Sequence, residues 1–287
     1  MNTVKNLNYS IQEFVLRPEN SQLRPATGSY STPFRGQLFG CDMAEDVEEK
    51  LAERNVSVLF LGSNPNCPGS LDNMTNQSTG EGDWQGFQIQ LKSGYFGERV
   101  TDQFGTARAW DPLHNPSTMG SGQRSSWTFY ADAIRTGVGS LDDVAMANVF
   151  SWGSGELDHM LKHLRAYDPG LLGRVISFAN KQLTTMLNCL RPQLVLCPLS
   201  ISNHHELRNL LLSRDQVKDS RNVSPSVLAS AFTMKLATTT INDREQRILF
   251  IKHPSALRWN RKADRPFIAE AMSSAICSAL VDGRMSS

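Results

Sequence analysis

The chain has 287 residues, of which 40% are hydrophobic and 20% are charged, and this ordinary globular composition excludes a collagen-like, coiled-coil or largely disordered protein. Its 29 basic and 28 acidic residues leave a formal net charge of +1. A protein that binds nucleic acid through overall positive charge is therefore not indicated, whereas a local basic patch is still allowed.

No apolar run reaches the roughly 18 to 20 residues that a membrane-spanning helix needs. The first 14 residues lack the charged and then apolar layout of a signal peptide. The cysteines are odd in number, widely spaced and without a CxxC pair: Cys41, Cys67, Cys189, Cys197 and Cys277. This usage is against a disulfide framework or a zinc ribbon, and we expect a cytoplasmic protein without a membrane partner.

Residues 1–42 carry several prolines and small polar residues, and we expect them to form an irregular N-terminal arm. Residues 43–287 are expected to form one domain. At its start, 43–54 has good helix formers with apolar side chains spaced by four. The run VSVLFLG at 56–62 is short, apolar and β-branched, which is typical of a strand buried on both faces of a parallel sheet.

Residues 66–125 have a different composition and are expected to be a loop-rich insertion. Nine of the 20 glycines fall there, together with many Ser, Asn and Gln. A long insertion of this kind in a compact domain is usually functional or disordered, and its aromatic residues argue against pure disorder.

Regular alternation resumes after the insertion. Helices are predicted at 126–137, 171–190, 202–212 and 266–281, and strands at 144–150, 193–199, 232–240 and 247–252. Strands that alternate with helices predict an α/β fold, here a three-layer α/β/α sandwich with a central, mostly parallel four-stranded sheet. Because ligands of such sheets bind beyond the carboxyl ends of the strands, the residues that follow each strand are the candidates for a site.

Several common chemistries are disfavoured. The chain has no GxxxxGK[ST] phosphate loop and no GxSxG nucleophile elbow, which argues against a small-molecule α/β hydrolase. His204 and His205 would point about 100° apart on a helix, so a shared metal ion is disfavoured. We expect neither a metal ion nor a cofactor.

Two strand ends carry the strongest motifs. The strand at 56–62 runs into GSNPN (62–66), and the strand at 247–252 is followed by HPSALRW (253–259). Asn148 lies on the strand between them. In this order the three elements resemble the uracil-DNA glycosylase superfamily, with its Gly-x-Asp/Asn-Pro loop, its base-recognising Asn and its His-Pro-Ser-x-Leu element. The resemblance covers roughly residues 50–282 without much of the insertion.

The resemblance implies that the chain is a DNA glycosylase. Asn64 would position the attacking water, His253 would stabilise the departing base, and Asn148 would recognise the base edge, with Gly62, Ser63 and Asn66 around the base. Excision passes through an oxocarbenium-like sugar and leaves an anionic pyrimidine. One preorganised donor to that anion is worth about 3–4 kcal/mol. Because an amide cannot accept a proton as a carboxylate would, we expect slower chemistry than in relatives with Asp at position 64.

A basic segment with interleaved apolar residues follows the last motif. Residues 244–265 contain seven Lys or Arg and two Asp or Glu. This pattern suits contact with DNA phosphates and a wedge that helps to flip a base out of the duplex. The expected DNA-binding residues are Ser255, Leu257, Arg258, Trp259, Arg261 and Lys262.

The chain departs from uracil-specific members of that superfamily in two respects. Asn66 stands where they often have a Tyr that blocks bases with a bulky C5 group. The aromatic residue that stacks on the flipped base has four candidates in the insertion: Trp84, Phe87, Tyr95 and Phe96. We therefore hypothesise that the substrate is uracil or a modified pyrimidine, such as a C5-hypermodified cytosine of phage DNA, with a role in antiviral defence.

The residues leave alternatives open. His253, Asn64 and Asn148 each have a structural role available as a turn, capping or packing residue, and the basic segment could be a solvated surface. A catalytically inactive nucleic-acid-binding protein on the same scaffold is the rival interpretation. DNA is the expected partner in both cases, and no obligate protein partner is evident.

Overall fold

The computed structural model describes residues 6–26, 56–64, 121–152, 156–224, 232–252 and 265–284. The helix expected at 43–54 and residues 66–120 of the expected insertion lie outside this part of the chain.

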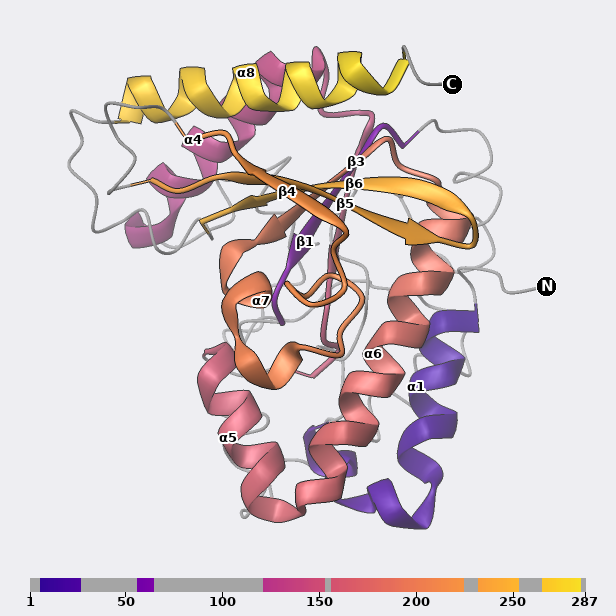
Figure 1. Cartoon of the computed structure of the whole chain (residues 1–287). Coiled ribbons are helices and arrows are strands. Elements are labelled where there is room, and N and C mark those ends of the chain that lie inside the picture. Colours follow the sequence, from indigo (N-terminus) through magenta and orange to yellow (C-terminus); the bar gives the residue numbers. More distant parts are fainter. Residues whose placement is uncertain are drawn as a thin grey trace.

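The structure is an α/β fold around one six-stranded sheet with the strand order β2-β1-β3-β6-β5-β4 (Figure 1). The strands are β1 (Val58–Gly62), β2 (Val144–Asn148), β3 (Leu194–Pro198), β4 (Asp219–Asn222), β5 (Lys235–Ile241) and β6 (Arg244–Ile251). The helices are α1 (Asn6–Leu16), η1 (Pro18–Ala26), α4 (Ser121–Val138), α5 (Leu157–Tyr167), α6 (Pro169–Leu190), α7 (Leu199–Asn203), η5 (His205–Leu207) and α8 (Arg265–Arg284).

The predicted α/β class is confirmed, but the expected total of four strands is wrong. Neighbours β2, β1, β3 and β6 run parallel, whereas β5 and β4 are antiparallel additions at one edge. Strand β5 runs antiparallel because a tight hairpin joins it to β6: Asn242 and Asp243, between the two strands, have positive φ angles of 48° and 62°. Two such residues make a turn that matches the twist of an antiparallel pair. The exposed β4 has the sequence DSRN, which carries no apolar pattern that could have predicted it.

Helices cover both faces of the sheet. Figure 1 shows α4 and α8 on one side and α1, α5 and α6 on the other. The strand residues divide accordingly: Leu59 and Leu61 of β1 belong to the core cluster with α1, α5 and α6, whereas Val58 and Phe60 belong to the cluster with α4 and α8. All five residues of β1, β2 and β3 are buried, as expected of strands covered on both faces.

The expected irregular N-terminal arm contains regular structure in its described part. Residues 6–16 form α1, and Ile11, Phe14 and Val15 are buried in the core. Their i, i+3, i+4 spacing places them on one face of the helix, which packs against α6.

The helix expected at 202–212 is also wrong. Helix α7 ends at Asn203, His204 has an extended backbone, and a single 3-10 turn follows. Ser202, the first residue of the predicted helix, donates its hydroxyl to the carbonyl of Leu199 inside α7. The other three helices predicted in the described ranges, at 126–137, 171–190 and 266–281, are found in slightly longer form as α4, α6 and α8. No helix in the described ranges is long and apolar enough to cross a membrane.

Candidate functional site

The carboxyl ends of the four parallel strands lie in one row. In the sheet register, Phe60 of β1 pairs with Met146 of β2 on one side and with Leu196 of β3 on the other. Leu196 pairs in turn with Leu249 of β6. Two residues further along, the same row consists of the strand-end residues Asn148, Gly62, Pro198 and Ile251. Adjacent strands are about 4.8 Å apart, so the ends of β1 and β6 are separated by roughly 10 Å.

Gly62 and Asn148 are direct partners across β1 and β2 and fit closely against each other. A Cβ atom on Gly62 would lie 2.6 Å from the Oδ1 of Asn148. Glycine at position 62 therefore leaves the space that the Asn148 amide occupies.

The Asn148 amide is buried with an unused donor. The residue is 2% exposed, and its Nδ2 has no hydrogen-bond partner among the described residues. A buried polar group without a partner costs about 1–3 kcal/mol, so such groups call for an explanation such as a bound ligand or water. The four residues that precede Asn148 in β2, with the sequence VAMA, are all apolar.

The segments after β1 and β2 stay paired beyond the sheet. The Val149 amide donates to the carbonyl of Gly62 and the Phe150 amide donates to the carbonyl of Ser63, each at 2.9 Å. Ser63 and Asn64 are half-buried. The predicted water-positioning residue Asn64 is thus held on a backbone that is bonded to the segment carrying Asn148.

The segment after β2 is also fixed from the helical side. Ser151 donates its hydroxyl to the Oε1 of Gln182 on α6 at 2.7 Å, and both residues are buried. Trp152 packs its ring against those of Phe14 and Phe178, with centroid distances of 5.8 and 5.7 Å. These contacts make one wall of the strand-end region rigid.

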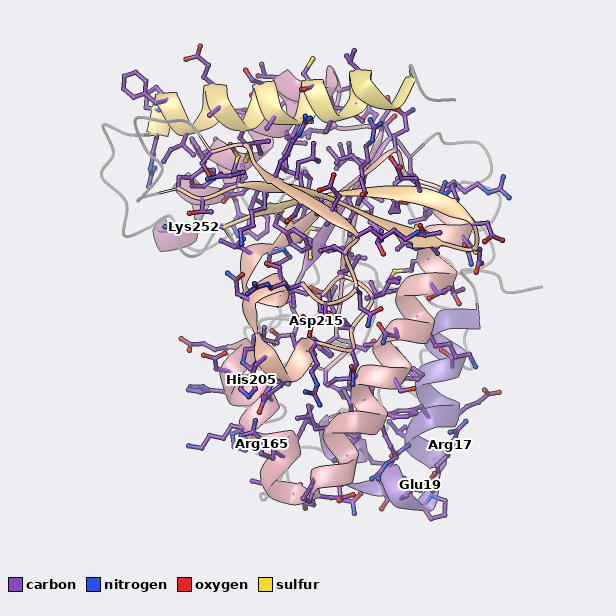
Figure 2. All side chains as sticks on the ribbon, viewed as in Figure 1. Arg17, Glu19, Arg165, His205, Asp215 and Lys252 are labelled. Atoms are coloured by element: carbon purple, nitrogen blue, oxygen red, sulfur yellow. The ribbon has the colours of Figure 1, made fainter. Side chains whose placement is uncertain are left out.

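The end of β6 is held by a buried tyrosine. Tyr130 on α4 is fully buried, and its hydroxyl donates a hydrogen bond to the backbone carbonyl of Lys252, which is labelled in Figure 2. Burial raises the pKa of Tyr130 well above its ordinary value, so the hydroxyl keeps its proton. This bond fixes the backbone at the residue directly before His253.

Four predicted site residues are brought together at one edge of the sheet: Gly62, Ser63, Asn64 and Asn148. The other predicted site residues lie outside the described part of the chain: Asn66, His253, Ser255, Leu257, Arg258, Trp259, Arg261 and Lys262. The four aromatic stacking candidates of the insertion lie outside it as well. Tyr130 and Gln182 were not predicted, since a tyrosine or glutamine inside an amphipathic helix carries no signal of its tertiary partner.

The histidine pair has a different geometry from the one we expected. Because His204 leaves the helix, its ring and that of His205 are stacked, with centroids 5.5 Å apart and an interplanar angle of 12°. The Nε2 of His204 lies 3.3 Å from the Oδ1 of Asp158, and Glu206 pairs with Arg165. Within the described ranges no three His, Cys, Asp or Glu side chains are arranged to hold a metal ion.

Comparison of the chain with protein-family models, with curated proteins and with solved structures gave no match. The residues at the strand ends therefore have to carry the functional inference by themselves.

Proposed function

We propose that the protein is a monofunctional, metal-independent DNA glycosylase that flips out uracil or a modified pyrimidine and hydrolyses its N-glycosidic bond, leaving an abasic site. The observation that carries this proposal is the buried Asn148 amide with its unused donor, fitted against Gly62 at the carboxyl ends of two adjacent parallel strands. Ligands of open parallel sheets bind at this edge.

A pyrimidine edge suits the Asn148 amide. An amide side chain offers both a donor and an acceptor, and uracil and cytosine present both kinds of group on their Watson–Crick edges. A base bound there gives the Asn148 Nδ2 the acceptor that it lacks among the described residues. Gly62 allows the close approach that this arrangement needs.

The two reacting groups belong to strands that end in the same row. Asn64 is two residues beyond Gly62, and His253 is two residues beyond Ile251, which occupies the same row. In the proposed reaction Asn64 orients the attacking water and His253 donates a hydrogen bond to the anionic base. Removal of one such donor typically lowers the rate about 10² to 10³-fold.

The proposal includes contact with DNA through the segment that follows His253. Leu257 would fill the gap left by the flipped base, and the neighbouring cations would bind phosphates. Asn66, in place of a bulky aromatic residue, favours a substrate with a C5 substituent, such as a hypermodified cytosine of phage DNA. Antiviral defence is the biological role that this substrate would suggest.

The test uses the full chain with duplexes that carry uracil, thymine mismatches or C5-modified cytosines, followed by alkaline cleavage of abasic sites. Release of one of these bases by the wild type and its loss in His253→Ala is the expected result, with His159→Ala, an exposed histidine on α5, as the matched control. Asn148→Ala should also abolish release, and Asn203→Ala on α7 is its control.

Two outcomes would contradict the proposal. Binding of DNA without release of any base would favour the catalytically inactive nucleic-acid-binding protein. Release that survives both His253→Ala and Asn148→Ala would show that the chemistry is performed elsewhere. A gain of rate in Asn64→Asp would support the assigned role of that residue, because a carboxylate accepts the proton of the water.

A further inference from the structure

A pocket of about 450 Å³ lies between α1 and the first half of α6. Ser10, Glu13 and Phe14 line it from one face of α1, and Arg17, the residue directly after α1, continues this lining. Its volume is within the range of about 300–1,000 Å³ that is usual for small-molecule sites. Figure 2 shows that Arg17, at the lower end of α1, is far from Lys252 at the end of β6, so this pocket is separate from the strand-end site.

The floor of the pocket is aromatic and rigid. The rings of Phe14 and Phe178 are stacked at a centroid distance of 4.3 Å with an interplanar angle of 19°. Both side chains are more than nine-tenths buried, and both pack on Trp152 in the core. A ligand in the pocket would therefore meet an apolar base that does not have to reorganise.

The rim of the pocket is positively charged. Three cationic side chains, those of Arg17, Arg174 and Lys181, line the pocket together with one carboxylate, that of Glu13. Neither Arg17 nor Lys181 has a side-chain hydrogen bond or ion pair with any described residue. These two cations are available to a ligand, whereas Arg174 is already partly engaged.

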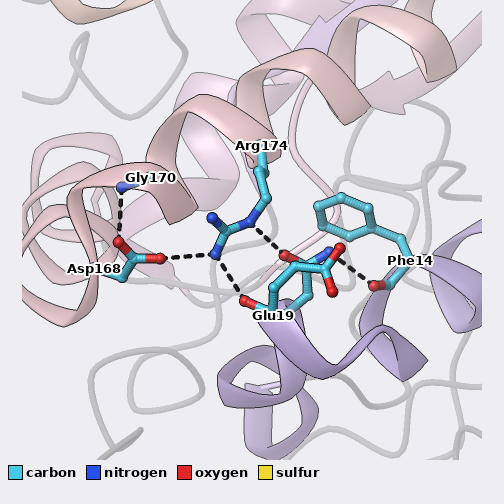
Figure 3. A network of polar contacts seen from close by, with 6 residues as sticks. Phe14, Glu19, Asp168, Gly170 and Arg174 are labelled. Atoms are coloured by element: carbon cyan, nitrogen blue, oxygen red, sulfur yellow. Dashed lines mark hydrogen bonds and ion pairs between the residues drawn. The ribbon is translucent and has the colours of Figure 1, made fainter.

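Figure 3 shows how Arg174 is held. Its Nη2 donates to the Oδ2 of Asp168 at 2.8 Å and to the carbonyl of Glu19 at 2.7 Å, while its Nε donates to the Oδ1 of Asn20 at 2.8 Å. The remaining nitrogen, Nη1, forms no hydrogen bond with any described residue. The guanidinium is thus fixed in place with one nitrogen left for a ligand, which is the preorganised arrangement that favours binding of an oxyanion.

Two glycine residues line the α6 side of the pocket. A Cβ on Gly170 would lie 2.9 Å from the Nη1 of Arg174, so glycine lets the guanidinium lie against the helix. At Gly173 a Cβ would meet no atom within 4 Å, because that position faces the open pocket.

We propose that this pocket binds a small phosphate ester, of the size of a mononucleotide. The three cations that line the pocket, Arg17, Arg174 and Lys181, attract a phosphate dianion, and guanidinium groups match phosphate oxygens in geometry. The aromatic floor accommodates the organic part of the ester, and the hydroxyls of Ser10 and Ser177 lie at the rim. A free phosphate ion would leave most of the volume unfilled.

Calorimetric titration of the full chain with uridine monophosphate tests the proposal, with uridine as the probe without phosphate. We expect a submillimolar Kd for the monophosphate and binding at least about tenfold weaker for uridine. The monophosphate affinity should fall with increasing salt, because the attraction is between exposed charges. Equal affinity for the two probes, or no heat with either, would overturn the proposal.

Gly173→Leu is the decisive variant, since Gly173 lines the pocket, a Cβ atom there meets no atom within 4 Å, and leucine is a better helix former than glycine. It should keep or raise the thermal stability and lower the monophosphate affinity by at least about tenfold. Ala166→Leu adds a leucine at an exposed position of α5 and should bind as the wild type does. Unchanged binding in Gly173→Leu would place the ligand elsewhere and refute the assignment.

A charge reversal and a competition complete the test. Lys181→Glu should weaken binding, whereas Lys162→Glu, on the exposed surface of α5, should not. An oligonucleotide without terminal phosphate that displaces the monophosphate would show that nucleic-acid backbone, not a free ester, is the ligand. No base release is measured in these titrations, so failure of the glycosylase proposal leaves this one standing, and the reverse also holds.

Discussion

Replacement of Gly62 by alanine tests the close fit between β1 and β2. The new Cβ would lie 2.6 Å from the Oδ1 of Asn148, whereas ordinary contacts begin at 3.4 Å. The two groups must therefore separate by 0.8 Å. Asn148 is buried and the backbone beyond it is bonded to Gly62 and Ser63, so little of this movement can be absorbed by rotation into solvent.

The expected loss of stability in Gly62→Ala follows from this geometry. Overpacking of a filled interior costs about 1–3 kcal/mol. In a protein of this size each kcal/mol lowers the melting temperature by about 2–4 °C. Urea denaturation followed by circular dichroism measures the free energy of unfolding directly. Gly173→Ala is the matched control: its Cβ meets no atom within 4 Å, and replacing glycine by alanine in a helix should stabilise by up to about 1 kcal/mol.

The same change should impair base release in the molecules that remain folded. Misplacement of a substrate-positioning group by about 1 Å can cost about 10²-fold in rate. Under the proposed function the Asn148 amide is such a group. A Gly62→Ala protein as stable as the wild type, or one destabilised no more than Gly173→Ala, would refute the packing argument; one that is destabilised but fully active would refute the role of Asn148.

Three further outcomes are expected. Tyr130→Phe removes the donor to the Lys252 carbonyl and should destabilise by about 1–2 kcal/mol, with faster amide hydrogen exchange at the end of β6, as mass spectrometry of exchanged peptides can show. The hydrogen bond from Arg174 and that from the Gly170 amide lower the pKa of Asp168 below its ordinary value of 3.8. This carboxylate therefore stabilises the fold above pH about 4 and loses that effect as the pH falls through its lowered pKa, so Asp168→Asn should show a smaller loss of stability in acid-range urea titrations. Burial raises the pKa of Cys197, so iodoacetamide should label it only after unfolding, whereas the exposed thiols on α6 and α8 should react in the native protein; native-state labelling of Cys197 would contradict its burial.

The parallel part of the sheet could be predicted from the sequence because strands that are buried on both faces consist of continuous apolar residues. The runs at 56–62, 144–150 and 193–199 are short, apolar and bounded by polar residues, and they correspond to β1, β2 and β3. The candidate residues Gly62 and Asn148 came from the resemblance to glycosylase motifs, and the structure has them at the ends of β1 and β2, with Asn148 at the end of its strand rather than inside it as predicted.

Elements that are stabilised mainly by tertiary contacts have weaker sequence patterns and were predicted less well. Helix α1 has an apolar face, but the prolines that follow it in η1 suggested an irregular arm. Helix α1 packs against α6, and η1, which follows it, is held by hydrogen bonds from Arg174 to Asn20 and to the Glu19 carbonyl, all of them contacts far along the chain. The break after α7 depends on local side-chain bonds of Ser202, which compete with helix formation and are not distinguished by residue type from a cap at a helix start.

The candidate site joins two observations that are independent in the sequence. A glycine ends β1 and an asparagine ends β2, and either residue alone is ordinary turn chemistry. The parallel register makes them partners, so that the missing side chain of Gly62 provides the space for the Oδ1 of Asn148. Folding alone does not require an amide there, because an apolar residue would avoid the cost of an unused buried donor, about 1–3 kcal/mol. A stability of about 5–15 kcal/mol tolerates such a cost at few positions, and a ligand with an acceptor at this edge removes it.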